Sequence, residues 1–351
     1  MIATATLLTM ALAGNVQAAE IRSVGPDGEA AVDASTIELT DDQIAQIKEG
    51  GYTAAICLHY GGNDWSTSQQ KGLEDTFGEL GIEIVAVTDA NFSAETQVSN
   101  IETVMAKKPD ILVSIPTDAT ATADAYKQAA AAGIKIVFMD QRANGLEAGK
   151  DYVSVVSADN YGNGYASGTV LGDALGGKGK VAMVYYDANF APTNQRDEGF
   201  RDAMKNYPDI EIVTEQGFTD ESGCAEQGDA ILTQFPNIDG IYASWDVPME
   251  GVLSAVRAAG MEGKVTLACN DLGNNVAREI ASGNIAGGGA QMPYDQGVAE
   301  AKLAALALLG EETPSYVAVP AETVTHENVL EAYTDVYHVE TPDWLKEAYV
   351  E

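Results

Sequence analysis

The chain has 351 residues, of which 46% are hydrophobic, so it is long and apolar enough to form two globular domains with complete cores. It carries 53 acidic against 19 basic residues, which gives a formal net charge of −34 at pH 7. Nucleic acid and anionic membrane surfaces repel a protein of this charge, and an acidic substrate is disfavoured unless local cations hold it.

The sequence begins with a predicted secretory signal peptide, residues 1–18. An apolar run ends in Val16-Gln17-Ala18 and Ala19, the pattern of a cleavage site, although the usual basic n-region is lacking. No other stretch is long and apolar enough to span a bilayer, so we expect an exported, periplasmic protein. Residues 19–49 are polar and acidic, and we interpret them as a leader with one short helix, DDQIAQIKEG, ahead of the compact body.

From Tyr52 onward, short apolar runs rich in β-formers alternate with longer amphipathic stretches. This alternation indicates parallel sheets covered by helices on both faces. The expected strands are 52–60, 82–89, 110–116, 134–140, 152–159, 180–187, 210–216, 238–246, 264–271 and 285–291. The helices expected between them are 66–81, 95–108, 118–133, 163–177, 195–207, 223–235, 249–260, 273–283 and 295–310.

About ten strands are too many for one open sheet of five or six, so the pattern predicts two doubly wound α/β domains. The second begins near Asp159. The tail, residues 315–351, contains Pro320 and Pro342 and is interpreted as irregular chain able to thread back between the domains.

Polar residues follow the predicted strands, and in open α/β sheets ligands bind beyond the carboxyl ends of strands. Helix caps and turns explain part of the pattern, and we assign Asp89, Asp118 and Asp187 to that role. Three other aspartates have polar or aromatic neighbours and are predicted to be functional. They are Asp140 beside Gln141-Arg142, Asp246 beside Trp245, and Asp271 beside Asn270.

Carboxylates, amides, a guanidinium and indoles together, without metal-ligand spacing, suit a sugar or polyol. Each hydroxyl of such a ligand donates to a carboxylate and accepts from an amide or guanidinium, while an indole covers its C–H face. Further candidates are Asn63 and Trp65 after the first strand, Arg196 in QRDEGF, and Gln291 at the end of AGGGAQ. A core role for either indole, a surface ion pair for Arg196 and a turn role for Gln291 stay open.

Several other chemistries are rejected. The run from Gly172 to Lys178 fits G-x-x-x-x-G-K but precedes a strand, whereas a P-loop follows one. The three histidines show no metal spacing, and no G-x-S-x-G elbow is present. Cys57 and Cys269 lie in apolar runs and are predicted to be buried thiols. We therefore expect no cofactor, no metal and no enzymatic nucleophile.

These motifs carry a family likeness. The segments GGNDWSTSQQKG, SIPTDA, IVFMDQR, SADNYGNG, QRDEGF, YASWD, LACNDLG and AQMPYDQG occur in this order across residues 50–325. In order and spacing they resemble type I periplasmic sugar-binding proteins of the ribose-binding class, the solute receptors of ABC importers. The resemblance implies sugar contacts from Asn63, Trp65, Asp140, Arg196, Trp245, Asp271 and Gln291, with Asn270 a weaker candidate.

The resemblance also implies a multi-strand hinge, with chain crossings near Ala158, Gln291 and Val317. It divides the chain into a first lobe, residues 50–158 and 292–318, and a second lobe, residues 159–291 and 319–351. Ser66, Gln141 and Trp245 depart from the ribose-binding pattern. The WD pair is similar to that of relatives that take pentoses, branched sugars or short alditols, so we favour a pentose or alditol.

The sequence therefore predicts a monomeric, non-enzymatic, exported receptor. Its two lobes are expected to close on a small neutral sugar or polyol, and the closed form is expected to dock on the membrane permease of an ABC importer. Two alternatives stay open. One is a receptor for chemotaxis or a sensor kinase in the same fold, and the other is a glycoside-processing enzyme that uses paired carboxylates.

Overall fold

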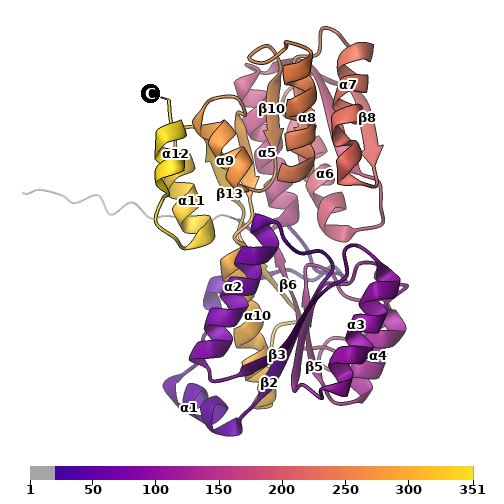
Figure 1. Ribbon diagram of the computed structural model, residues 1–351, viewed down its shortest axis with the longest axis vertical. Helices are drawn as coiled ribbons and strands as arrows, with labels where there is room; N and C mark the ends of the chain where they lie inside the picture. The colour runs from indigo at the N-terminus through magenta and orange to yellow at the C-terminus, as the bar shows by residue number, and fades with distance from the viewer. Residues whose placement is uncertain (1–19, 351) are drawn as a thin grey trace, which may run out of the picture.

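The computed structural model describes residues 20–350, so the predicted signal peptide, residues 1–18, lies outside the described residues. The described chain forms two α/β lobes, each built on its own sheet. In Figure 1 the first lobe is the lower one and the second is the upper one.

The sheet of the first lobe has seven strands, and every neighbouring pair is parallel. In spatial order the strands are β1 (Val32–Asp33), β12 (Tyr316–Val319), β6 (Ser154–Ala158), β5 (Lys135–Met139), β4 (Ile111–Ser114), β2 (Thr53–Leu58) and β3 (Glu83–Asp89). Apolar side chains of α1 (Asp41–Gly50), α2 (Asp64–Glu79) and α10 (Pro293–Leu308) fill one core cluster. Those of α3 (Ala94–Ala106) and α4 (Ala123–Ala131) fill another, so helices cover both faces.

The second lobe has a six-stranded sheet, parallel except for one antiparallel pair formed by its last strand. The order is β13 (Glu322–Thr325), β11 (Gly287–Ala290), β10 (Thr266–Cys269), β9 (Gly240–Ala243), β7 (Lys178–Tyr186) and β8 (Asp209–Phe218). α5 (Asn160–Ala174) and α6 (Ala191–Met204) pack in one cluster. α7 (Cys224–Gln234), α8 (Asp246–Ala258) and α9 (Asn274–Ala281) pack in the other.

The predicted fold class, two doubly wound lobes, is confirmed. All ten strands expected between residues 52 and 291 form. The inner strands form from apolar runs that are buried between two helical layers, whereas the edge strands β3 and β8 are largely not buried. The chain changes sheet three times: after β6, after β11 and between β12 and β13.

The acidic leader differs from its interpretation as a segment ahead of the body. β1 pairs with β12, with Val32 opposite Val317, and so extends the first sheet. α1 begins with a capping box made by Thr40 and Gln43, and its Ile47 is fully buried in the first lobe. The segment is mostly polar, so the few apolar residues that pack it onto the first lobe were not recognised in the sequence.

The tail was predicted to be irregular, and that prediction is wrong. It forms β12, β13, α11 (Val329–Tyr337) and α12 (Asp343–Ala348). Its apolar side chains, among them Val329, Val336 and Leu345, join the core of the second lobe. Four-residue strands flanked by prolines give too short an alternation to recognise, and the neighbouring strands supply their pairing.

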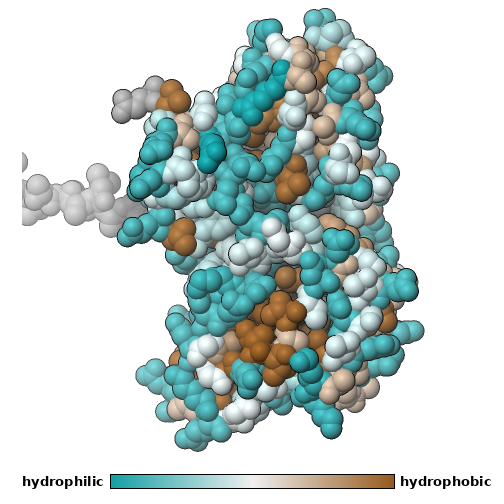
Figure 2. Space-filling view, in the orientation of Figure 1, coloured by the Kyte–Doolittle hydropathy of each residue, from teal (hydrophilic) through white to brown (hydrophobic). Residues whose placement is uncertain are grey.

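All three cysteines are free and buried, which confirms the prediction for Cys57 and Cys269. Across residues 20–350 no helix combines the length and the apolar character needed to cross a membrane. Hydrophilic side chains cover most of the face in Figure 2. The hydrophobic area on the first lobe, brown in Figure 2, lies where Figure 1 draws β2 and the edge strand β3. Val87 of β3 is exposed.

Candidate ligand-binding site

A cavity lies between the lobes, beyond the carboxyl ends of strands from both sheets. We call its lining residues the cavity wall. The first lobe contributes His59, Tyr60, Asn63, Trp65, Phe92, Ile115 and Asp140, and the second contributes Tyr186, Phe190, Pro192, Thr193, Arg196, Trp245, Asp271 and Gln291. A ligand in this cavity touches both lobes at once.

Arg196 organises the polar side of the cavity. Its Nε donates to Asn160 Oδ1 (2.8 Å), and its Nη1 donates to the Ser244 carbonyl and to Asp271 Oδ2, both at 3.3 Å. Gln291 Nε2 donates to the other Asp271 oxygen (2.7 Å). Two donors therefore fix the Asp271 carboxylate, while Gln291 Oε1 is buried and has no partner among residues 20–350.

Asp140 supplies a second carboxyl from the first lobe. Its Oδ1 accepts from Ser157 Oγ (3.0 Å), from the Ala158 amide (3.3 Å) and from Gln296 Nε2 (3.3 Å). Burial raises the pKa of the Asp140 carboxyl, and the Arg196 guanidinium opposes that shift.

Asp140 and Asp271 share an unusual backbone conformation. Their φ angles are +53° and +69°, in the left-handed region that non-glycine residues rarely adopt. Asp140 directly follows β5, and Asp271 comes two residues after the end of β10; both carboxyls line the cavity. Backbone strain of this kind clusters at functional sites, and here it falls on the two carboxyls that line the cavity.

Aromatic rings gather around His59 in another part of the cavity wall. The imidazole stacks on Phe190 (centroids 5.5 Å apart) and meets Trp65 and Phe92 edge-on (5.9 and 5.2 Å). Burial, with a smaller contribution from the Arg196 cation, lowers the pKa of His59 from 6.5 to about 3. His59 is therefore neutral at pH 7 and serves as a flat aromatic surface.

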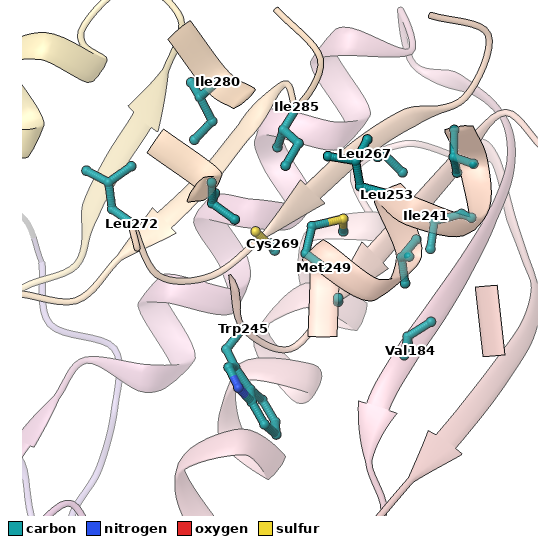
Figure 3. Packing of buried hydrophobic residues seen from close by; sticks show 14 of the residues in the cluster. Val184, Ile241, Trp245, Met249, Leu253, Leu267, Cys269, Leu272, Ile280 and Ile285 are labelled. Carbon is teal, nitrogen blue, oxygen red and sulfur yellow. The ribbon is translucent and has the colours of Figure 1, made fainter. Parts of the chain in front are cut away.

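The two indoles play different parts. Trp245 Nε1 donates to Glu221 Oε1 (2.9 Å), and its ring meets Tyr186 edge-on (5.6 Å). Figure 3 shows Trp245 at the margin of the core cluster, its indole directed away from Met249 and Cys269. Trp65 Nε1, in contrast, is buried without a partner among residues 20–350. Trp245 thus offers a ring face, and Trp65 also offers a free donor.

Seven of the nine predicted site residues meet at the cavity wall, and as ligand contacts they remain predictions. They are Asn63, Trp65, Asp140, Arg196, Trp245, Asp271 and Gln291. Asn270 lies behind the wall. Its Nδ2 donates to Tyr242 Oη (2.8 Å) and to the Ser244 carbonyl (3.0 Å), and its Oδ1 accepts from Ser167 Oγ (2.8 Å). Its side chain is thus occupied in holding the strand that supports Arg196.

Asp246 also lies outside the cavity wall. It is the first residue of α8, and its Oδ1 accepts from the Val247 amide (2.8 Å). Its other oxygen faces Gly273, where an added Cβ would collide with it. Trp245, the N-cap residue of α8, lines the cavity, whereas the Asp246 carboxyl is held at the start of the helix and faces Gly273.

The aspartates assigned to turns behave as predicted where the structure shows their bonds. Asp89 accepts from the Asn91 amide (2.7 Å), and Asp118 accepts from the amides of Thr120 and Ala121 (both 2.8 Å). Asp187 is exposed and lies outside the cavity wall.

Sequence reasoning missed the other wall residues, which are His59, Tyr60, Phe92, Ile115, Tyr186, Phe190, Pro192 and Thr193. All but the last three lie at or just beyond a strand end, the same signal that identified the carboxyls. A search restricted to polar groups and tryptophan excluded them.

Beside the cavity, carboxyls of the two lobes approach each other. Asp64, on α2, accepts from the backbone amide and from the side-chain Nδ2 of Asn274, on α9 (both 2.8 Å). Asp64 Oδ2 also lies near Gly273, which faces Asp246. Burial and the negative charges of Asp271, Glu250 and Asp64 raise the pKa of Asp246 well above its usual value.

We expect ligand binding to take up a proton. Closure brings Asp64 to Asp246, so the closed form has the higher Asp246 pKa and holds the proton more tightly than the open form. Affinity is then greatest at low pH, and it declines as pH rises from the open-form pKa to the closed-form pKa. Calorimetry in buffers of different ionisation enthalpy measures the uptake.

Asp246→Asn is the matched variant, because it keeps the shape and removes the titration. We expect it to lose the proton uptake and to flatten the pH profile of affinity. Equal uptake by the variant and the wild type would contradict the assignment to Asp246.

Three kinds of comparison relate the chain to known proteins. Residues 54–312 match the family described as periplasmic binding protein domain. The chain is 24% identical over 272 residues to the ribose import binding protein of Salmonella typhimurium, which covers 78% of this chain and 90% of that protein. It is 29% identical over 273 residues to a D-ribose/D-allose-binding protein of Pseudomonas aeruginosa, covering 75% and 83%.

Solved structures of sugar-binding proteins also match the fold of this chain. A periplasmic solute binding protein of an ABC transporter from Actinobacillus succinogenes, with bound D-allose, matches with a TM-score of 0.73 at 29% identity and covers 79% of this chain and 99% of its own. A second, from Agrobacterium vitis, bound with α-D-tagatopyranose, matches with a TM-score of 0.76 at 25% identity, covering 83% and 100%. These matches confirm the resemblance inferred from the motifs.

Proposed function

Because the chain belongs to the periplasmic binding protein domain family, we propose that it is the exported substrate-binding protein of an ABC importer. Its ligand is a small neutral sugar or polyol, a pentose or an alditol, held between two closing lobes. The protein binds this ligand without transforming it and delivers it, as a monomer, to a membrane permease. The relatives' names, which are those of sugar-binding proteins, support transport over the sensory and glycoside-processing alternatives.

The observation that carries the proposal is that hydrogen-bonding groups and aromatic rings line the same cavity. Arg196, Asp271 and Gln291 form a hydrogen-bonded set on the cavity wall. This set can accept a further hydrogen bond from a ligand, because Gln291 Oε1 has no partner among the described residues. The same cavity wall contains the aromatic rings of His59 and Trp245. A ligand with hydroxyls and apolar C–H faces suits both kinds of group.

Charge supports a neutral ligand. The Arg196 guanidinium already pairs with Asp271 and lies close enough to act on the Asp140 carboxyl. An anionic sugar would therefore meet two carboxyls and only one cation that is already paired. We expect sugar acids and sugar phosphates to be excluded on this ground.

Closure is supported by bonds between the lobes around the cavity. Asn274 donates twice to Asp64, and the Ala191 amide donates to Gln141 Oε1 (3.2 Å). Tyr60 Oη donates to Glu221 Oε2 at 3.5 Å, and the same carboxyl accepts the hydrogen bond from Trp245 Nε1. The lobe-closed form thus has its own stabilising contacts, to which a bridging ligand adds.

The test is a thermal-shift screen of pentoses, hexoses, alditols, sugar acids and sugar phosphates, followed by calorimetry on the ligands that raise the melting temperature. We expect at least one neutral pentose or alditol to bind stoichiometrically and to be recovered unchanged by mass spectrometry. Binding restricted to the anionic compounds, or to no compound of the screen, would refute the proposed ligand class. Conversion of a bound glycoside would favour the enzymatic alternative.

A further inference from the structure

A second buried carboxyl lies behind the cavity, inside the first lobe. Glu300, on α10, is completely buried, as are Gln69 on α2 and Gln296, which precedes Glu300 by one turn of α10. Across residues 20–350, Glu300 forms no ion pair with a lysine, arginine or histidine. A buried, ionised carboxylate without a cation is costly, so this group needs another means of satisfaction.

The hydrogen bonds of the cluster leave three oxygens without donors. Gln69 Nε2 donates to Glu300 Oε1 (2.7 Å), and Gln296 Nε2 donates to Asp140 Oδ1 (3.3 Å) and to the Val156 carbonyl (3.1 Å). Glu300 Oε2, Gln69 Oε1 and Gln296 Oε1 have no partner among the described residues. When Glu300 is ionised all three are acceptors, so no bond forms between them.

One proton on Glu300 Oε2 turns that oxygen into a donor for one of the other two, Gln296 Oε1. Gln296 is four residues earlier on the same helix face, within reach of that hydroxyl. Burial, followed by the negative charge of Asp140, raises the pKa of Glu300 well above its usual value, and the amides of Gln69 and Gln296 oppose this. Asp140 is the charged group that faces Glu300, and Arg196 in turn acts on Asp140.

We propose that Glu300 is a positioning residue held as a neutral acid, whose hydroxyl donates to Gln296 Oε1 and so orients the Gln296 amide toward Asp140. The inference rests on the proposed function, in which Asp140 receives a ligand hydroxyl. With Glu300 ionised, the Gln296 amide turns to donate to Glu300 and presents its oxygen to Asp140. The ligand-facing carboxyl then loses a donor and gains a repulsive neighbour.

Infrared spectroscopy tests the protonation state without ligand. We expect the wild-type protein at pH 7 to show the carbonyl band of a neutral carboxylic acid, and Glu300→Gln to lack that contribution in the difference spectrum. Other neutral carboxyls, such as that of Asp246, cancel in this difference. A difference spectrum without the band would overturn the proposal, whatever ligand the protein takes.

Binding tests the positioning role. Glu300→Met keeps the approximate volume but has no donor, and we expect it to weaken affinity about tenfold, the scale of one lost hydrogen bond. Glu300→Gln keeps an N–H donor for Gln296 and is expected to restore affinity to within about threefold.

The same substitutions in an Asp140→Ala background separate positioning from general destabilisation. We expect Glu300→Met to have no further effect there, because its action passes through Asp140. An equal loss in both backgrounds, or no loss in the wild-type background, would overturn the proposal. If the wild-type protein binds no sugar at all, the proposed function fails, and the infrared result still decides the state of Glu300.

Discussion

Asp271→Ala is expected to weaken sugar affinity by about 2–4 kcal/mol, or about 30- to 1000-fold, the scale for truncating one member of a buried, hydrogen-bonded charge pair. The substitution removes the acceptor of both Arg196 Nη1 and Gln291 Nε2. It leaves the guanidinium buried without its carboxylate and removes a ligand acceptor at the same time. Isothermal titration calorimetry with the ligand found in the screen measures the loss.

Asp118→Ala is the matched control, since Asp118 also follows a strand but caps a turn through the amides of Thr120 and Ala121. We expect it to lower the melting temperature slightly and to leave affinity within about twofold, because a cap contributes only about 1 kcal/mol to folding. Equal losses of affinity in the two variants would show that the separation of contacts from turn residues is mistaken.

Trp245→Ala is expected to weaken affinity by about 2 kcal/mol, the scale of a buried aromatic hot spot. Two losses contribute. The ligand loses a ring, and the partly buried Glu221 loses its indole donor. Because Trp245 also packs on Tyr186 and Phe218, we expect the free energy of unfolding to fall by about 3 kcal/mol.

Trp245→Phe distinguishes these contributions. It keeps an aromatic face but has no N–H for Glu221, so we expect it to recover most of the affinity and to leave a smaller stability deficit. If Trp245→Phe binds as poorly as Trp245→Ala, the hydrogen bond to Glu221, and not the ring face, determines affinity. Calorimetry and chemical unfolding on the same preparations separate the two outcomes.

The strand ends explain why much of the candidate site was accessible from sequence. The carboxyl ends of strands from both sheets border the cavity, so Asp140 of the first lobe and Asp271 of the second meet there although they are far apart in the chain. Arg196 reaches the same cavity from α6. The same logic failed for Asn270, whose side chain is bonded inside the lobe, and for Asp246, which begins α8. The residues at which a strand ends and the next helix begins vary by one or two, so the sequence does not decide which of two adjacent residues faces the ligand.

The burial of individual side chains and their hydrogen-bond or ion-pair partners could not be predicted from the sequence. In the sequence, Glu300 looks like an ordinary charged residue on the exposed face of an amphipathic helix. The packing of α2 against α10 shows that its side chain is fully buried and, among the described residues, not paired with a cation. His59 likewise reads as an isolated histidine until Phe190 and Trp65 are seen to enclose it. A one-dimensional pattern carries no information on which distant residue covers a side chain.

The order of the strands has a consequence for biosynthesis. β12 lies between β1 and β6 in the first sheet, and α10 fills that lobe's core, yet both are made after almost all of the second lobe. The N-terminal half therefore cannot complete its fold while the ribosome is still extending the chain before residue 316. Such pairing between distant segments slows folding, which leaves a long interval in which an unfinished polypeptide stays available to a chaperone or a translocase.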